Sequence, residues 1–85
     1  MTTTNRIRPE DMVRVVIYYE GREADAHEGS GYHTVEEAVN DAYDASSRTP
    51  LDKEDYVYRV TDTAHDTSAR YRFNAGGNLR ILPEE

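Results

Sequence analysis

The sequence predicts a small α+β domain in which one amphipathic helix packs on one face of an antiparallel sheet, with elements in the order ββαβββ. Apolar residues alternate near the N-terminus, as in a strand, and recur with helical spacing from residue 35. Three β-rich segments separated by turn residues then complete the chain. With 85 residues, a single domain over residues 11–85 is expected, preceded by a mobile tail of residues 1–10.

The first strand is predicted over residues 12–19, which are rich in β-branched and aromatic side chains. Every second residue is expected to face the core: Val13, Val15, Ile17 and Tyr19. Glu20 and Gly21 predict a tight turn. Residues 22–28 alternate small and polar side chains, which indicates a short edge strand.

The helix is predicted to begin after Thr34, the first residue of a Thr-Val-Glu-Glu capping box. In this motif the Thr34 hydroxyl accepts from the Glu37 amide, and the Glu37 carboxylate accepts from the Thr34 amide. Pro50 predicts an end near Ser46 or Ser47. The apolar stripe comprises Val35, Ala38, Val39, Ala42 and Tyr43. The solvent side carries four acids, Glu36, Glu37, Asp41 and Asp44.

Three further strands are predicted over residues 56–61, 69–74 and 79–82, joined by turns at 62–67 and 75–78. Their alternate residues are expected to complete the core: Tyr56, Tyr58, Val60, Ala69, Tyr71, Phe73, Leu79 and Ile81. Because this core is rich in tyrosine, each buried hydroxyl needs a hydrogen-bond partner or access to water.

A single helix covers one face of a sheet, so the other face is expected to meet water or a partner. The residues predicted on this outer face are Arg14, Val16, Tyr18, Glu20, Val57, Arg59, Thr61, Arg70, Arg72, Asn74, Arg80 and Leu82. Five are arginines and one is an acid, although the whole chain has 17 acids, 10 bases and a net charge of −7. The outer face is therefore predicted to be basic.

Two interpretations of this face are open. In the first, nearby acids cover its edges as surface salt bridges of little net value; the candidates are Glu10, Asp11, Glu54, Asp55, Glu84 and Glu85. In the second, it binds an acidic protein or a second copy of the chain, through Arg14, Val16, Tyr18, Arg59, Arg70, Arg72 and Arg80. Single-stranded nucleic acid stacking on Tyr18 is an alternative ligand, which the negative net charge disfavours.

The acidic helix face supports a different hypothesis. Glu36, Glu37, Asp41 and Asp44 would imitate phosphates and occupy the nucleic-acid site of a basic protein. The chain would then act as a nucleic-acid mimic or inhibitor.

No catalytic, cofactor or metal site is predicted, and we expect a non-enzymatic protein. The chain has no cysteine, so disulfides and thiolate ligands are excluded. His27, His33 and His65 do not match a metal-binding spacing, and Gly29-Ser30-Gly31 is too short for a hydrolase elbow. No apolar run resembles a secretion signal or a membrane span, so a cytoplasmic location without membrane contact is expected.

Overall fold

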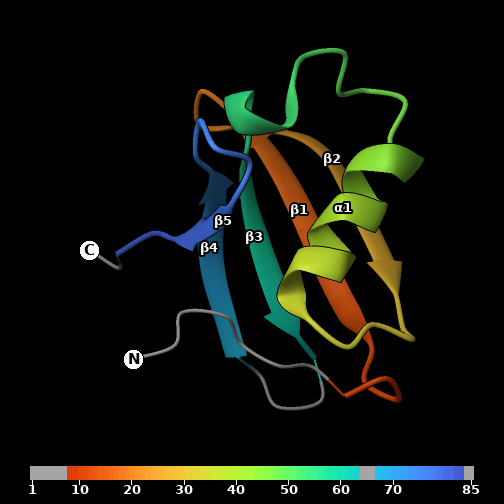
Figure 1. Ribbon diagram of the computed structural model, residues 1–85. Coiled ribbons are helices and arrows are strands. Elements are labelled where there is room, and N and C mark those ends of the chain that lie inside the picture. Colours follow the sequence, from red (N-terminus) through yellow and green to blue (C-terminus); the bar gives the residue numbers. More distant parts are fainter. Residues whose placement is uncertain (1–7, 64–66, 84–85) are drawn as a thin grey trace.

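The computed structural model describes residues 8–63 and 67–83, so residues 1–7 of the predicted tail, His65, Glu84 and Glu85 lie outside the described residues. It has five strands in one antiparallel sheet of order β2-β1-β3-β4-β5 (Figure 1). The elements are β1 (Val13–Tyr19), β2 (Arg22–Gly29), α1 (Val35–Ala45), the short 3-10 helix η1 (Lys53–Asp55), β3 (Val57–Asp62), β4 (Thr67–Phe73) and β5 (Leu79–Ile81). The predicted fold class is confirmed, as is the edge strand after the first turn.

The hairpin of β1 and β2 is closed by Glu20 and Gly21, whose φ angles are 51° and 81°. Positive φ at both positions fits the right-handed twist of a two-residue hairpin. The prediction that Glu20 lies on the outer sheet face is therefore wrong, because Glu20 belongs to the turn. Further along, Ile17 pairs with Asp25 while Tyr18 pairs with Glu23, which leaves Ala24 as the extra residue of a β-bulge.

The core lies between α1 and the sheet, and the helix crosses β1 and β2 on one face (Figure 1). The predicted core is largely confirmed: Val13, Val15, Ile17, Val35, Ala38, Val39, Ala42, Tyr56, Tyr58, Val60, Tyr71 and Phe73 are all buried in one cluster. Tyr19 and Ile81 lie on the predicted side of the sheet, Tyr19 against the ring of Tyr56 and Ile81 opposite Tyr71, but they are not buried, since Tyr19 is 39% exposed and Ile81 is 41% exposed. Tyr19 stands at the end of β1 beside the turn, and Ile81 lies on β5, which α1 does not cover (Figure 1).

The capping box predicts two hydrogen bonds at the start of α1, and the structure has one of them. The Glu37 amide donates to the Thr34 hydroxyl over 3.2 Å. The Glu37 carboxylate, however, accepts from the amide of His33 at 2.7 Å, so the predicted return bond to Thr34 is replaced by one to the preceding residue. Both bonds occupy the otherwise unpaired N-terminal end of the helix.

Replacing Thr34 by alanine is expected to lower the free energy of unfolding by about 1 kcal/mol, because one helix-end amide loses its acceptor. Ser47→Ala is the matched control, since Ser47 is exposed and lies beyond the helix. Urea unfolding monitored by circular dichroism measures both. Equal midpoints for the two variants would contradict a capping role for Thr34.

Three tyrosines, of which Tyr56 and Tyr58 are buried, form hydrogen bonds to the segment that precedes β3. The Tyr56 hydroxyl accepts from the Leu51 amide at 2.9 Å, and the Tyr58 hydroxyl donates to the Lys53 carbonyl at 2.9 Å. The Tyr43 hydroxyl donates to the Leu51 carbonyl. Three rings from the helix and the sheet thus fix this loop against the core.

Lys53, the single lysine of the chain, is part of this packing. Its Nζ donates to Oδ1 of Asn40 at 2.8 Å and lies 5.8 Å from the ring centre of Tyr43 and 5.7 Å from that of Phe73. A cation at this distance from aromatic rings is attracted to them. Lys53 therefore joins α1 to the sheet through η1.

Candidate basic interface

The outer face of the sheet carries a contiguous group of four arginines on three neighbouring strands. Arg59 on β3 is directly opposite Arg70 on β4, and Arg72 on β4 is directly opposite Arg80 on β5. Directly paired residues share a face, and so do residues two apart on one strand. We call these four residues the arginine block: Arg59, Arg70, Arg72 and Arg80.

Two arginines of the block are held by neutral acceptors. Nη2 of Arg70 donates to the Pro83 carbonyl at 3.0 Å, and Nε of Arg72 donates to the Glu54 carbonyl at 3.2 Å. A guanidinium has five N–H donors, so each of these two side chains keeps donors for a ligand. Both contacts position the arginines without neutralising their charge.

The acids expected to cover this face do not do so in the part of the chain that the structure describes. Within residues 8–63 and 67–83, no carboxylate forms an ion pair with an arginine of the block. Glu54 contributes its backbone carbonyl rather than its carboxylate, and Asp11 is buried, with 7% of its surface exposed. The predicted neutralising salt bridges are therefore not seen among these residues.

Placing arginines opposite each other has a physical cost. Like charges on directly opposed residues of an antiparallel pair are destabilising. The sheet contains two such pairs, Arg59 with Arg70 and Arg72 with Arg80. Anionic groups of a ligand placed between the paired guanidinium groups would offset this repulsion, so the arrangement favours an acidic ligand.

The remaining residues predicted for this interface lie on β1. Val16 is opposite Arg59, and Tyr18 is opposite Val57, so the structure brings them onto the same face as the block. Val16 is only 8% exposed. Tyr18 and Val57 keep part of their surface in water and offer more apolar area to a partner.

Strand β2 adds two acids that the sequence reasoning missed. Glu28 is opposite Arg14, and Glu23 is opposite Tyr18, so both glutamates lie on the outer face, and both are exposed. The outer face is thus acidic along β2 and basic over β3, β4 and β5, with Arg14 at the acidic margin. The bulge at Ala24 shifts the register of this strand, which the alternation of small and polar residues does not reveal.

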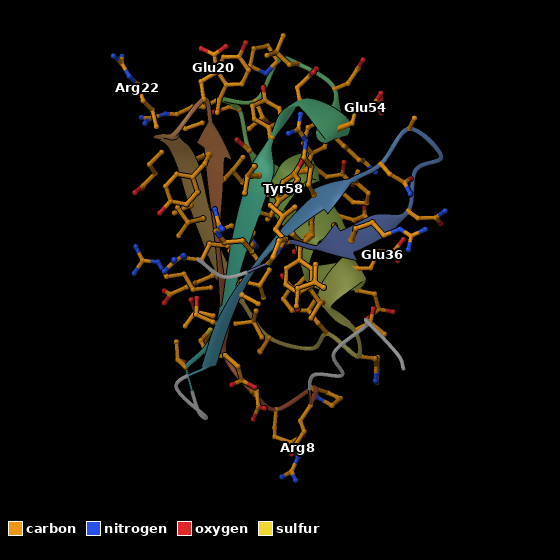
Figure 2. All side chains as sticks on the ribbon, turned by 90° about the vertical axis from the view of Figure 1, so that its left-hand side faces the viewer. Arg8, Glu20, Arg22, Glu36, Glu54 and Tyr58 are labelled. Atoms are coloured by element: carbon orange, nitrogen blue, oxygen red, sulfur yellow. The ribbon has the colours of Figure 1, made fainter. Side chains whose placement is uncertain are left out.

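The acidic face of α1 is partly used by the protein itself. Glu36, Glu37, Asp41 and Asp44 are all exposed, and Figure 2 shows Glu36 on the helix side of the sheet. The Glu37 carboxylate caps the His33 amide. The Asp41 carboxylate accepts a hydrogen bond from the Tyr32 hydroxyl and lies 3.2 Å from Nε2 of His27.

Polar contacts of this kind fasten α1 to the edge strand β2. Besides the contact of His27 with Asp41, the Ser46 hydroxyl donates to the Asp25 carboxylate at 2.6 Å. This bond, together with the Ala26 amide, lowers the pKa of Asp25. Partial burial and the bond to Asp41 raise the pKa of Tyr32 to about 12. These side chains hold the fold together, which gives them a structural role.

The described residues contain neither a cluster of metal-ligating side chains nor a membrane-spanning helix. Over residues 8–63 and 67–83, no group of three or more histidine, aspartate or glutamate side chains is arranged to hold a metal ion. No helix in the same residues is both long and apolar enough to cross a membrane.

Comparisons with known proteins add no family to this description. No family model matches the sequence, and neither the curated proteins nor the solved structures gave a significant match.

Proposed function

We propose that this protein is a non-enzymatic interaction module that binds an acidic surface of another protein through the outer face of its sheet. The single observation that supports this is the arginine block, four cations on adjacent strands whose described contacts are neutral carbonyls. Arginine pairs with carboxylates through two parallel hydrogen bonds. Tyr18 and Val57, beside the block, would supply apolar contact area.

A different protein suits this face better than a second copy of the chain. Each outer face carries five arginines against two glutamates, so two such faces would repel each other. Nucleic acid is disfavoured for another reason, because a net charge of −7 opposes the approach of phosphate groups from a distance.

The absence of cysteine is consistent with a cytoplasmic location, which we propose together with the binding function.

The acidic helix face is the weaker candidate. A phosphate mimic needs carboxylates that are free to meet a basic site, whereas Glu37 and Asp41 already accept hydrogen bonds within the protein. Replacing Glu36, Glu37, Asp41 and Asp44 by their amides tests this alternative. We expect partner binding to persist in that variant.

Charge reversal at Arg59 and Arg72 is expected to weaken binding of a glutamate-rich peptide at least tenfold at about 50 mM salt, since charge-assisted bonds are lost. The control is Arg22→Glu with Arg48→Glu, which changes the net charge equally at exposed residues outside the block. NMR titration following the arginine Nε–H signals measures both affinity and location. Equal weakening by the two double variants would show that only net charge matters and would overturn the proposed interface.

A further inference from the structure

Strand β5 leaves one edge of the sheet open beside the arginine block. It is the last strand in the order and, within residues 8–63 and 67–83, pairs with β4 alone. Amides of Asn74 and Leu82 donate to the carbonyls of Asn78 and Arg70 at 2.9 Å and 2.8 Å, and Arg80 pairs with Arg72 between them. In this antiparallel pattern the N–H and C=O groups of Leu79 and Ile81 point away from the sheet.

The side chains of β5 alternate in chemistry along this open edge. Ile81 is 41% exposed and Leu79 is partly buried, both on the helix side. Arg80 is exposed on the outer face, opposite Arg72. Because α1 does not extend over β5 (Figure 1), the edge presents apolar, basic and apolar side chains in turn.

We propose that β5 binds an extended segment of the acidic partner by strand addition. The segment would place a carboxylate beside Arg80 and apolar side chains beside Leu79 and Ile81, and its backbone would pair with the open groups of β5. Its recognition pattern is an acidic residue flanked by two apolar ones. This inference rests on the proposed function, because the acidic side chain would meet the arginine block.

A second copy of the chain does not fit this edge. If two β5 strands paired antiparallel through Leu79 and Ile81, Arg80 of each copy would stand directly opposite Arg80 of the other. Like charges in that position are destabilising. At the opposite side of the sheet, β2 carries a bulge at Ala24 and the acids Glu23 and Glu28 on the outer face, which protect that edge from pairing and repel an acidic segment.

The test uses two fluorescent seven-residue peptides of identical composition, one alternating valine and glutamate, the other with the valines and glutamates in separate blocks. We expect the alternating peptide to bind at least tenfold more tightly by fluorescence anisotropy. Hydrogen exchange of the Leu79 and Ile81 amides should slow at least tenfold when it binds, since these amides become paired. Equal affinity, or unchanged exchange at both amides, would overturn strand addition.

Two variants identify the edge itself. Ile81→Pro removes an amide that points away from β4 and should abolish the preference for the alternating peptide. An alternating peptide whose valines are N-methylated lacks the N–H donors that would pair with β5, so it should bind the unaltered protein no better than the block peptide does. This second experiment tests strand addition even if Ile81→Pro does not fold. Retained preference in both experiments would contradict the inference.

The outcome also separates this inference from the proposed function. Arg59→Glu with Arg72→Glu should weaken both peptides. If both peptides bind equally and both depend on these arginines, the basic interface stands and only strand addition fails. If neither peptide depends on them, the proposed function of the outer face fails.

Discussion

Ile17→Ala is expected to destabilise the protein by about 3–4 kcal/mol, because it removes a fully buried side chain and leaves a cavity between β1 and α1. Ile17 has 0% of its surface exposed. A domain of this size is stabilised by only roughly 4–13 kcal/mol in total. The variant is therefore expected to unfold at a much lower urea concentration than the parent.

Leu51→Ala is the control for this prediction. It deletes the same number of carbon atoms from a side chain that is 40% exposed, and its backbone bonds to Tyr43 and Tyr56 remain available. We expect a loss below about 1 kcal/mol. Urea unfolding with equal losses for both variants would contradict the position of Ile17 in the core.

Raising the pH above about 10 is expected to destabilise the protein, because its folded state favours the protonated form of three tyrosines. Burial, followed by the hydrogen bond to Asp41, raises the pKa of Tyr32 to about 12. Burial is also the main cause that raises the pKa of Tyr43 and of Tyr58. A pKa that is two units higher in the folded protein corresponds to roughly 2–3 kcal/mol of stability for one group.

Stability falls with rising pH because the pKa of these tyrosines is higher in the folded protein than in the unfolded chain. The stabilisation is fully present below pH 10, the ordinary tyrosine value, and is lost as the pH rises toward the folded pKa. Urea midpoints at intervals between pH 8 and pH 12 measure it. Tyr32→Phe should lessen the decline, and a parent midpoint that stays constant up to pH 12 would refute the effect.

The sequence is informative wherever a periodic pattern meets a strong local signal. The alternation of Val13, Val15 and Ile17 predicts which face of β1 is buried, and Thr34 predicts the start of α1, both as the structure has them. In each case one short-range rule decides the conformation. The outer positions of Arg59, Arg70, Arg72 and Arg80 follow from the same alternation in β3, β4 and β5.

Other features depend on contacts that pattern alone does not give. The bulge at Ala24 shifts the register of β2, which places Glu28 instead of His27 opposite Arg14 on the outer face. Exposure of Tyr19 and Ile81 reflects where the single helix ends and which strands it covers, a tertiary property. The position of Lys53, with its Nζ near the rings of Tyr43 and Phe73, also depends on tertiary contacts.

These differences change the description of the candidate interface. The outer face is not uniformly basic, because β2 contributes glutamates while the arginine block occupies the other side. An acidic partner would therefore be oriented, with its carboxylates over β3, β4 and β5 and away from β2. Electrostatic complementarity of this kind fixes orientation and selects among partners more than it adds affinity.

The most direct test of the basic interface is affinity capture from a nuclease-treated native lysate. The parent, Arg59→Glu with Arg72→Glu, and Arg22→Glu with Arg48→Glu are compared as baits, after circular dichroism has shown that all three fold. We predict that the parent and the control variant, Arg22→Glu with Arg48→Glu, retain the same acidic protein. The variant of the block, Arg59→Glu with Arg72→Glu, should lose it. Retention of every captured protein by the Arg59 and Arg72 variant would contradict a binding role for this face.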